Sequence, residues 1–235
     1  MVFRFKQFIA EDDRSTMRIG TDAVLLGAWA EPGTAQSILE IGTGCGVISL
    51  MLAQKSDASI DAIDIDEESV KQAGSNFLQS PWSEKLHPLP VSLQDLVSTS
   101  QQKYDLVITN PPFFTGSLPS PEPRKNRARH TMSLSRKELL SGIVHFLKDE
   151  GFFLVILPAE ESQKFSLLAE TAGLFTRKQM RVRPMTGKPV NRVLTMFGFK
   201  PCSIPLLEDL IIRNPDQTFT KEYITFTDAY YFSLR

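Results

Sequence analysis

The sequence is poor in cysteine and has no long hydrophobic run. Two of its 235 residues are cysteines, Cys45 and Cys202, and their separation fits no metal-binding spacing. A disulfide framework is therefore not expected, and a reducing cytoplasm is the natural location. The longest apolar stretches, residues 23–30 and 152–157, are too short to span a bilayer. The charged N-terminus also lacks the apolar segment of a signal peptide.

The sequence also lacks a strong net charge of either sign. Its formal net charge is −1, which gives no global basic signal for nucleic acid. The charges are nevertheless distributed unevenly along the chain. Residues 57–68 contain six acidic residues and no basic one, whereas residues 171–200 contain seven basic residues and no acidic one. This asymmetry predicts one electropositive face on the folded protein.

A glycine-rich turn follows the first predicted buried strand, residues 38–41. The turn has the pattern Glu40-x-Gly42-x-Gly44-x-Gly46. Alternating glycines let the backbone approach a ligand closely, and the helix predicted at residues 47–55 favours electronegative atoms at its N-terminus. A nicotinamide-binding fingerprint beginning at the first two glycines requires a third one at position 47, where this chain has Val47. The pattern therefore argues against a nicotinamide cofactor.

Carboxylates follow the next two predicted strands. Residues 59–63 form a strand that ends at Asp64, and an acidic residue at this position can accept hydrogen bonds from ribose hydroxyls. Asp66 is better explained as the cap of the helix that runs to about residue 79. The third strand, residues 86–93, is followed by Asp95. This carboxylate either meets the adenine amino group of a cofactor or lies on a surface loop, and both interpretations stay open.

The stretch YDLVITNPPFF, residues 104–114, predicts a buried strand that stops at Asn110. Two prolines lack N–H donors and end the hydrogen-bond ladder there. The Asn110 side-chain oxygen and the Pro111 carbonyl are two adjacent acceptors that suit an exocyclic amino group. Phe113 or Phe114 offers a face on which a planar ring can stack. The alternative is a turn followed by two core phenylalanines.

A basic loop follows this stretch. Residues 115–131 are rich in proline, serine and basic residues, and a loop of this length is usually functional or disordered. The predicted RNA-binding residues of the loop are Arg124, Lys125, Arg127, Arg129 and His130. A solvated run of charges is the alternative.

The remaining sequence continues the alternation of helices and strands. A helix is predicted at residues 23–30, with Thr21 or Asp22 as its N-cap. The later elements are a helix at 135–149 capped by Ser135, a strand at 152–157, a helix at 159–172, and strands at 175–182 and 190–199. The last two strands predict an antiparallel hairpin at the end of a parallel sheet. Residues 204–235 have strand-like patches and no clear motif.

Three marks occur in a fixed order: the glycine turn, Asp64, and Asn110–Phe113. Together they resemble the class I S-adenosylmethionine-dependent methyltransferases that carry an Asn-Pro-Pro-aromatic motif. Three further stretches are MRIGTDAVLLGAWA, ARHT and FTKEYITFTDAYYF. With them, the chain resembles the tRNA adenine-N6 methyltransferase family, which modifies adenine-37 of a valine tRNA. One departure is Phe113, where related enzymes often have tyrosine. Stacking requires only a ring face, so activity is still expected.

The resemblance implies an α/β, Rossmann-like fold: a mostly parallel seven-stranded sheet with helices on both faces and a C-terminal antiparallel hairpin. A single methyltransferase domain is expected, with residues 1–30 covering the cofactor, 31–200 forming the core and 201–235 forming a tail. The implied S-adenosyl-L-methionine site comprises Thr21, Asp22, Glu40, Gly42, Thr43, Gly44, Gly46, Asp64, Asp95 and Asn110. The implied catalytic residues are Asn110, Pro111, Pro112 and Phe113.

The expected partner is tRNA, and no metal, membrane or obligate protein partner is expected. The same Asn-Pro-Pro-aromatic motif suits any planar amide or amine. A protein glutamine N5-methyltransferase and an rRNA or DNA amino-methyltransferase therefore remain alternatives. An RNA-binding module without activity is disfavoured because the motif and the glycine turn are intact.

Overall fold

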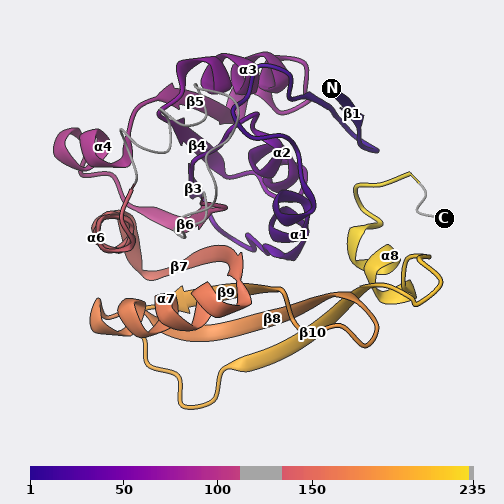
Figure 1. The fold of residues 1–235 in the computed structure, drawn as a ribbon. Helices are drawn as coiled ribbons and strands as arrows, with labels where there is room; N and C mark the ends of the chain where they lie inside the picture. The colour runs from indigo at the N-terminus through magenta and orange to yellow at the C-terminus, as the bar shows by residue number, and fades with distance from the viewer. Residues whose placement is uncertain (112–133, 233–235) are drawn as a thin grey trace.

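A central sheet organises the protein, seen here in a computed structural model that describes residues 1–111 and 134–232 (Figure 1). The strands are β1 (Val2–Arg4), β2 (Ile9–Glu11), β3 (Ser37–Ile41), β4 (Ser59–Asp64), β5 (Leu86–Pro90), β6 (Tyr104–Thr109), β7 (Leu147–Pro158), β8 (Phe175–Met185), β9 (Arg192–Gly198) and β10 (Leu206–Arg213). The helices are α1 (Thr21–Trp29), α2 (Val47–Ala53), α3 (Glu67–Leu78), η1 (Ser83–Lys85), α4 (Leu93–Thr99), α6 (Arg136–Phe146), α7 (Ala159–Thr171) and α8 (Lys221–Thr227).

The sheet is mostly parallel and contains eight strands in the order β10-β8-β9-β7-β6-β3-β4-β5. Strand β9 is antiparallel to both of its neighbours, which confirms the predicted hairpin of β8 and β9. The sheet has one strand more than expected, because β10 pairs in parallel with β8 at the edge. An edge strand buries little of itself, and most residues of β10 are exposed or half-buried. It therefore lacks the apolar run by which a buried strand is recognised.

Helices cover both faces of the sheet, as expected for this fold class. Helices α1 and α2 lie on one side of the strands and α4 and α6 on the other (Figure 1). Side chains along each strand alternate between two cores, since successive residues point to opposite faces. In β6, for example, Leu106 and Ile108 pack into the core beneath α1 and α2, whereas Val107 packs into the core beneath α6 and α7. No helix in residues 1–111 and 134–232 is long and apolar enough to cross a membrane.

Several predicted boundaries shift in the structure. Helix α6 ends at Phe146 rather than at 149, and β7 begins directly afterwards at Leu147. Strand β5 ends at Pro90, so that Leu93 opens a helix instead of ending a strand. The prediction that Thr21 or Asp22 caps the first helix is wrong. The N-cap of α1 is Gly20, and no side chain accepts a capping hydrogen bond there.

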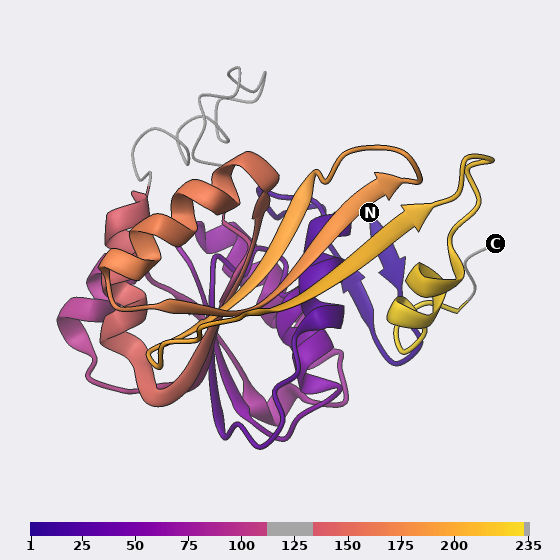
Figure 2. The ribbon, with the colours of Figure 1, turned by 90° about the horizontal axis from the view of Figure 1, so that it is seen from below.

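The segment expected to be a C-terminal tail contributes β10 and α8. Strands β8, β9 and β10 are long and extend past the helices toward α8 (Figure 2). The last turns also meet the N-terminus, because the Lys6 N–H donates to the Tyr230 carbonyl at 2.8 Å. The turn after β1 and the residues after α8 therefore lie side by side.

Candidate cofactor and substrate site

A cavity of about 1370 Å³ opens at the carboxyl ends of the central strands. Its inner wall consists of the glycine turn after β3, residues 63–66 at the end of β4, residues 91–94 after β5 and residues 109–111 at the end of β6. Because these strands are parallel, their carboxyl ends meet at one edge of the sheet. Residues 16–23 cover the cavity from the N-terminal side. Five segments that are distant in the sequence thus line one cavity.

The glycine turn needs its glycines for conformation and for packing. Gly42, Gly44 and Gly46 have φ angles of 75°, 55° and 83°, in the left-handed region that other residues rarely adopt. A Cβ atom on Gly46 would lie 2.4 Å from Cε1 of Phe77 in α3. Among the residues that the structure describes, no atom lies within 4 Å of a Cβ built on Gly42. The turn therefore packs tightly against α3 while its first glycine leaves open space for a ligand.

Asp64 ties the glycine turn to the end of β4. Its Oδ2 accepts a hydrogen bond from the Gly44 N–H at 2.9 Å, and its Oδ1 accepts one from the Asp66 N–H at 2.9 Å. Burial raises the pKa of Asp64 above its ordinary value, although these two N–H groups oppose the shift. Each carboxylate oxygen has a second lone pair, so the group can still accept hydrogen bonds from ligand hydroxyls. Asp66 instead caps α3, as predicted, by accepting from the Ser69 N–H.

Glu40 is buried behind the turn and carries one unused oxygen. Its Oε2 accepts hydrogen bonds from Thr43 Oγ1 at 2.8 Å, from the Ser49 N–H at 3.1 Å and from Ser49 Oγ. Its Oε1 is buried and accepts no hydrogen bond from any residue that the structure describes. Burial raises the pKa of Glu40 to about 7. A buried carboxylate oxygen beside the cavity fits a cationic ligand group, which would satisfy it and favour its charged form.

The cavity wall after β5 differs from the prediction. Ser92, Leu93 and Gln94 line the cavity, whereas Asp95 does not. Asp95 lies behind Ser92, because its Oδ2 accepts from Ser92 Oγ at 2.6 Å and its N–H donates to the same hydroxyl at 3.0 Å. Ser92 is the N-cap of α4, and the spacing Ser-x-x-Asp before an apolar residue is a capping signal. That signal was in the sequence and would have placed Asp95 in the helix.

Asn110 and Pro111 line the same cavity as the glycine turn. They follow β6, whose last residue is fixed by a hydrogen bond from Thr109 Oγ1 to the Ile41 carbonyl at 2.7 Å. Asn110 is half-buried. Pro112 and Phe113 lie outside the described residues, as do the predicted RNA-binding residues Arg124, Lys125, Arg127, Arg129 and His130.

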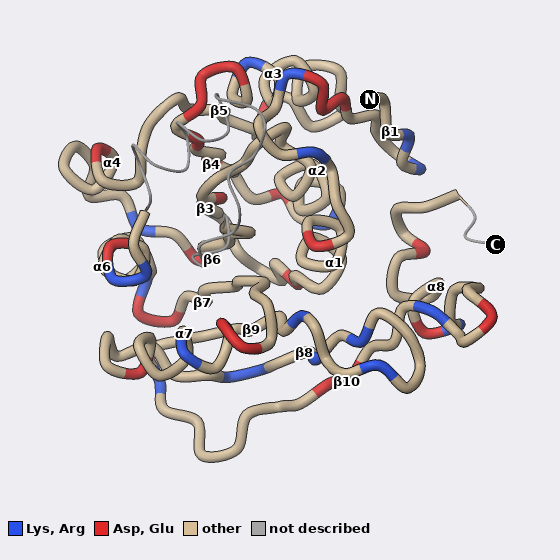
Figure 3. The backbone as a smooth tube through the Cα atoms, viewed as in Figure 1, with Lys and Arg blue, Asp and Glu red and all other residues tan. Residues whose placement is uncertain are grey.

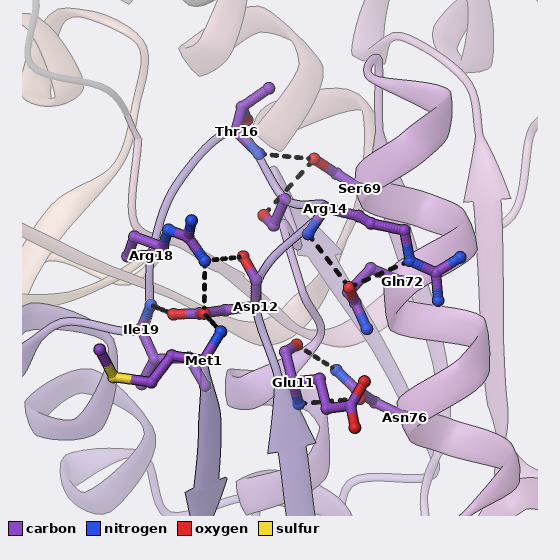
Figure 4. A network of polar contacts seen from close by, with 11 residues as sticks. Met1, Glu11, Asp12, Arg14, Thr16, Arg18, Ile19, Ser69, Gln72 and Asn76 are labelled. Carbon is purple, nitrogen blue, oxygen red and sulfur yellow. Dashed lines mark hydrogen bonds and ion pairs between the residues drawn. The ribbon is translucent and has the colours of Figure 1, made fainter.

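Residues 11–23, of which 16–23 line the cavity, are called the N-terminal cover. Asp12 holds this segment in place (Figure 4). This buried carboxylate accepts from the α-amino group of Met1, from Arg18 Nη1 and from the Ile19 N–H, each at 2.9 Å. Burial alone would raise its pKa, but these donors outweigh burial and the pKa is lowered. Helix α3 holds the same segment through Asn76, which accepts from the Glu11 N–H at 3.0 Å. Residues 11–19 are thereby fixed along α3 beside the glycine turn.

The protein shares both sequence and fold with known methyltransferases. The sequence profile of the Methyltransferase small domain family matches residues 15–166. A relative from Phocaeicola vulgatus named tRNA1(Val) (adenine(37)-N6)-methyltransferase is 40% identical over 233 residues, which cover 99% of this chain and 98% of the relative. The chain belongs to the tRNA1(Val) (adenine(37)-N6)-methyltransferase family.

Further comparisons agree with this membership. A methyltransferase of the same name from Cronobacter sakazakii is 36% identical over 97% of this chain and 94% of the relative. The crystal structure of a "predicted O-methyltransferase" from Agrobacterium tumefaciens superposes with a TM-score of 0.63, covering 89% of this chain and 96% of that one. At 17% sequence identity, that likeness shows the shared fold alone. The resemblance drawn from the glycine turn, Asp64 and Asn110 is thus confirmed at the level of the family.

In this methyltransferase the start of α1 is joined to the start of β9 across the cavity. Asp22 Oδ2 accepts a hydrogen bond from Arg192 Nε at 2.9 Å, and both side chains are about one-quarter exposed, at 24% and 26%. Thr21 and Asp22 both line the cavity, and their contact with the cofactor stays a prediction. The ion pair therefore links the N-terminal cover to the hairpin of β8 and β9.

Sequence reasoning missed the outer wall of the methyltransferase cavity. The lining residues that it did not identify on this side include Arg213, Gln217, Phe219, Tyr223 and Tyr231. Most of them lie in β10, in the turn after it and in α8, where no motif was recognised. The stretch FTKEYITFTDAYYF contributed to the family resemblance, but it carries no periodic signal of a binding site.

Proposed function

We propose that this protein transfers a methyl group from S-adenosyl-L-methionine to the exocyclic N6 amine of adenine-37 in a valine tRNA. One observation carries the proposal: Asn110 lines the same cavity as the glycine turn, Glu40 and Asp64. The proposed cofactor site and the proposed site for a planar amine therefore lie in one cavity. The names of relatives that match nearly the whole chain support the choice of tRNA over the other substrates of the motif.

The cavity residues fit the chemical groups of this cofactor. Glu40 Oε1 offers a buried carboxylate oxygen for the α-ammonium group, since no described residue satisfies it. Asp64, fixed by two N–H donors, offers its remaining lone pairs to the ribose hydroxyls. The segment 92–94 is the part of the wall that remains for the adenine ring. When bound, the cofactor supplies a sulfonium with an activated methyl group.

Asn110 and Pro111 would act on the nucleophile. The adenine amine is a weak nucleophile because its lone pair is delocalised into the ring. The Asn110 side-chain oxygen and the Pro111 carbonyl would accept hydrogen bonds from the two amine protons and localise that lone pair toward the methyl group. This contribution is electrostatic and positional, so no strong general base is required. The target base must leave its stack to reach the cavity.

The ring-stacking role of Phe113 and the RNA contacts of the basic loop rest on the sequence alone. Stacking on Phe113 would orient the adenine, and the four loop cations from Arg124 to Arg129 would contact phosphates. Because the proposed substrate is tRNA, we place the reaction in the cytoplasm.

The decisive experiment offers the purified protein four separate acceptors: tRNA, rRNA, DNA and protein. S-adenosyl-L-methionine with a labelled methyl group is the donor. We expect label in tRNA, and N6-methyladenosine at position 37 when the valine tRNA is digested and analysed by mass spectrometry. A valine tRNA transcript with guanine in place of that adenine is the matched control and should stay unlabelled. Label on glutamine in the protein fraction, with none in tRNA, would refute the proposal.

A further inference from the structure

A layered cluster of side chains stands on the outer wall of the cavity. We call it the C-terminal platform and define it by Lys188, Arg213, Gln217, Phe219 and Tyr223, all of which line the cavity. The platform lies where β8, β9 and β10 extend toward α8, away from the glycine turn (Figure 2). No role for the platform follows from the cofactor or from the transferred methyl group.

The edge of the sheet brings the two cations of the platform together. Arg213 at the end of β10 is in register with Met185 at the end of β8. The Thr186 N–H donates to the Arg213 carbonyl at 3.0 Å, which fixes the turn after β8 against β10. Gly187 follows with φ of 78°, and Lys188 comes next, exposed to solvent. The positions of both cations are therefore set by backbone contacts.

Arg213 is held flat by its neighbours. Its guanidinium carbon lies 4.1 Å from the centroid of the Phe219 ring, and its Nη1 donates to the Gln217 carbonyl. Phe219 in turn stacks on Tyr223, with centroids 5.2 Å apart and planes inclined by 24°. A guanidinium fixed in this way loses little side-chain freedom when it binds a phosphate or meets a base. Its N–H fork suits phosphate oxygens, and its plane suits stacking.

The ion pairs of the basic residues in 171–200 also bear on the C-terminal platform. Five of the seven basic residues in 171–200 form ion pairs: Lys178 with Glu208, Arg181 and Arg183 both with Asp209, Arg192 with Asp22 and Lys200 with Glu150. Figure 3 shows basic and acidic segments along the neighbouring strands β8 and β10. Lys188 and Arg213 have no acidic partner among residues 1–111 and 134–232. Arg177 has none there either, but it donates to the Lys200 and Pro201 carbonyls and does not line the cavity. Among the described bases of 171–200, the one that lines the cavity without an acidic partner is therefore Lys188, on the same wall as Arg213.

We propose that the C-terminal platform binds the RNA backbone beside the adenine that enters the cavity. Arg213 and Lys188 contact the phosphate that flanks the target nucleotide, and the Arg213 plane supports the neighbouring base. The cavity volume of about 1370 Å³ exceeds the roughly 300–1,000 Å³ typical of a small-molecule site, which leaves room for a nucleotide next to the cofactor. This inference rests on the proposed function, since it assumes an RNA substrate.

The test uses three variants and a matched control. Arg213→Ala removes the charge and the plane, Arg213→Lys keeps the charge but loses the plane, and Lys188→Ala alters an exposed side chain that cannot affect folding through the core. Lys200→Ala is the control, because it also removes one positive charge from the hairpin but at the opposite end. For each protein we would measure tRNA affinity across a salt series without methyl donor, the KM for tRNA, and S-adenosyl-L-methionine affinity by calorimetry.

We expect Arg213→Ala to raise the KM for tRNA about tenfold and to flatten the salt dependence of binding by about 0.7 for one lost phosphate contact. Lys188→Ala should flatten the slope similarly, while Arg213→Lys should keep the slope and still weaken binding. Lys200→Ala should match the wild type, and cofactor affinity should be unchanged throughout. Wild-type tRNA affinity and slope in Arg213→Ala would overturn the inference, as would a loss of cofactor affinity alone. If the wild type methylates no tRNA, the proposed function itself fails, which the wild-type reaction reveals separately.

Discussion

Gly44 donates its backbone N–H to Asp64 Oδ2 at 2.9 Å, which couples the glycine turn to the end of the neighbouring strand. The conformation of the glycine turn is thus stabilised by Asp64, which follows Gly44 by twenty positions in the sequence. Neither group has to move to receive a ligand, since the N–H is satisfied and the carboxylate keeps free lone pairs. Preorganisation of this kind reduces the cost of ordering a site on binding.

Replacing Asp64 with alanine should weaken S-adenosyl-L-methionine binding by about 1–3 kcal/mol, because ribose hydroxyls and the Gly44 N–H would lose their acceptor. Calorimetry on the free protein measures this change. Asp57→Ala is a suitable control, since Asp57 is fully exposed and lies at the opposite end of β4. Unchanged affinity in the Asp64 variant would assign the ribose to another acceptor, most directly Asp66.

Glu40 predicts a pH-dependent cofactor affinity. Its pKa is raised from 4.5 to about 7 by burial, so the carboxyl is partly protonated near neutral pH. Pairing with the ligand ammonium requires the ionised form. Affinity for S-adenosyl-L-methionine should therefore increase as the pH rises from about 6 to about 7.5, and Glu40→Gln should be weaker and lose this dependence. Calorimetry at several pH values checks both statements, and a variant with the wild-type pH profile would contradict them.

The same shift affects the stability of the ligand-free protein. A carboxyl whose folded pKa is above its unfolded value binds more protons in the folded state between the two values. The contribution of Glu40 to the free energy of unfolding should thus decline as the pH rises from 4.5 to about 7. Glu40→Gln should remove this decline in thermal unfolding curves.

How far the sequence predicts this molecule depends on whether the signal is local. The glycine turn, the capping by Asp66 and the strand before Asn110 are encoded within a few residues, and the structure has them where expected. Asp95 was expected directly after a strand at residues 86–93, but it lies in the first turn of α4. In this short segment the capping signal of Ser92 competes with the apolar pattern of a strand. A capping signal is decisive only when the following helix is known.

The outer wall, by contrast, is not locally encoded. Arg213 becomes a cavity residue because β10 joins the sheet beside β8, and that pairing brings together residues about thirty positions apart. The partial exposure of β10 removes the apolar periodicity by which strands are detected. Charge pairing is equally non-local, as the ion pair between Asp22 and Arg192 shows. A basic run in the sequence therefore does not by itself predict a free electropositive surface.

Asn110→Ala should lower kcat by about 10²–10³, the usual cost of removing one preorganised polar group from a reacting centre. Cofactor affinity should remain near wild type, because the side chain is assigned mainly to the substrate amine. Single-turnover methylation of tRNA at saturating cofactor measures the first quantity and calorimetry the second. Near-wild-type turnover would rule out amine activation by Asn110, and a large loss of cofactor affinity would move its role to the cofactor.

Asp12 should control the N-terminal cover without touching the reacting groups. Asp12→Asn weakens three hydrogen bonds to the cover at once, from Met1, Arg18 and the Ile19 N–H. Arg18 and the Met1 amino group are largely exposed, at 57% and 75%, so their ion pairs contribute little. The bond from the half-buried Ile19 N–H to the buried Asp12 carboxylate dominates, and the free energy of unfolding should fall by about 1–3 kcal/mol.

The lowered pKa of Asp12 sets the direction of the pH effect. A carboxyl whose folded pKa lies below its usual 3.8 stabilises the protein above that value, and the contribution is lost as the pH falls below it. The difference in stability between wild type and Asp12→Asn should thus be full at pH 7 and shrink in acid. Because residues 16–23 line the cavity, the variant should also bind S-adenosyl-L-methionine more weakly at neutral pH. Arg18→Ala, which removes only an exposed partner, should change both quantities much less. Wild-type cofactor affinity in a destabilised Asp12→Asn protein would show that the cover serves the fold and does not help to hold the ligand.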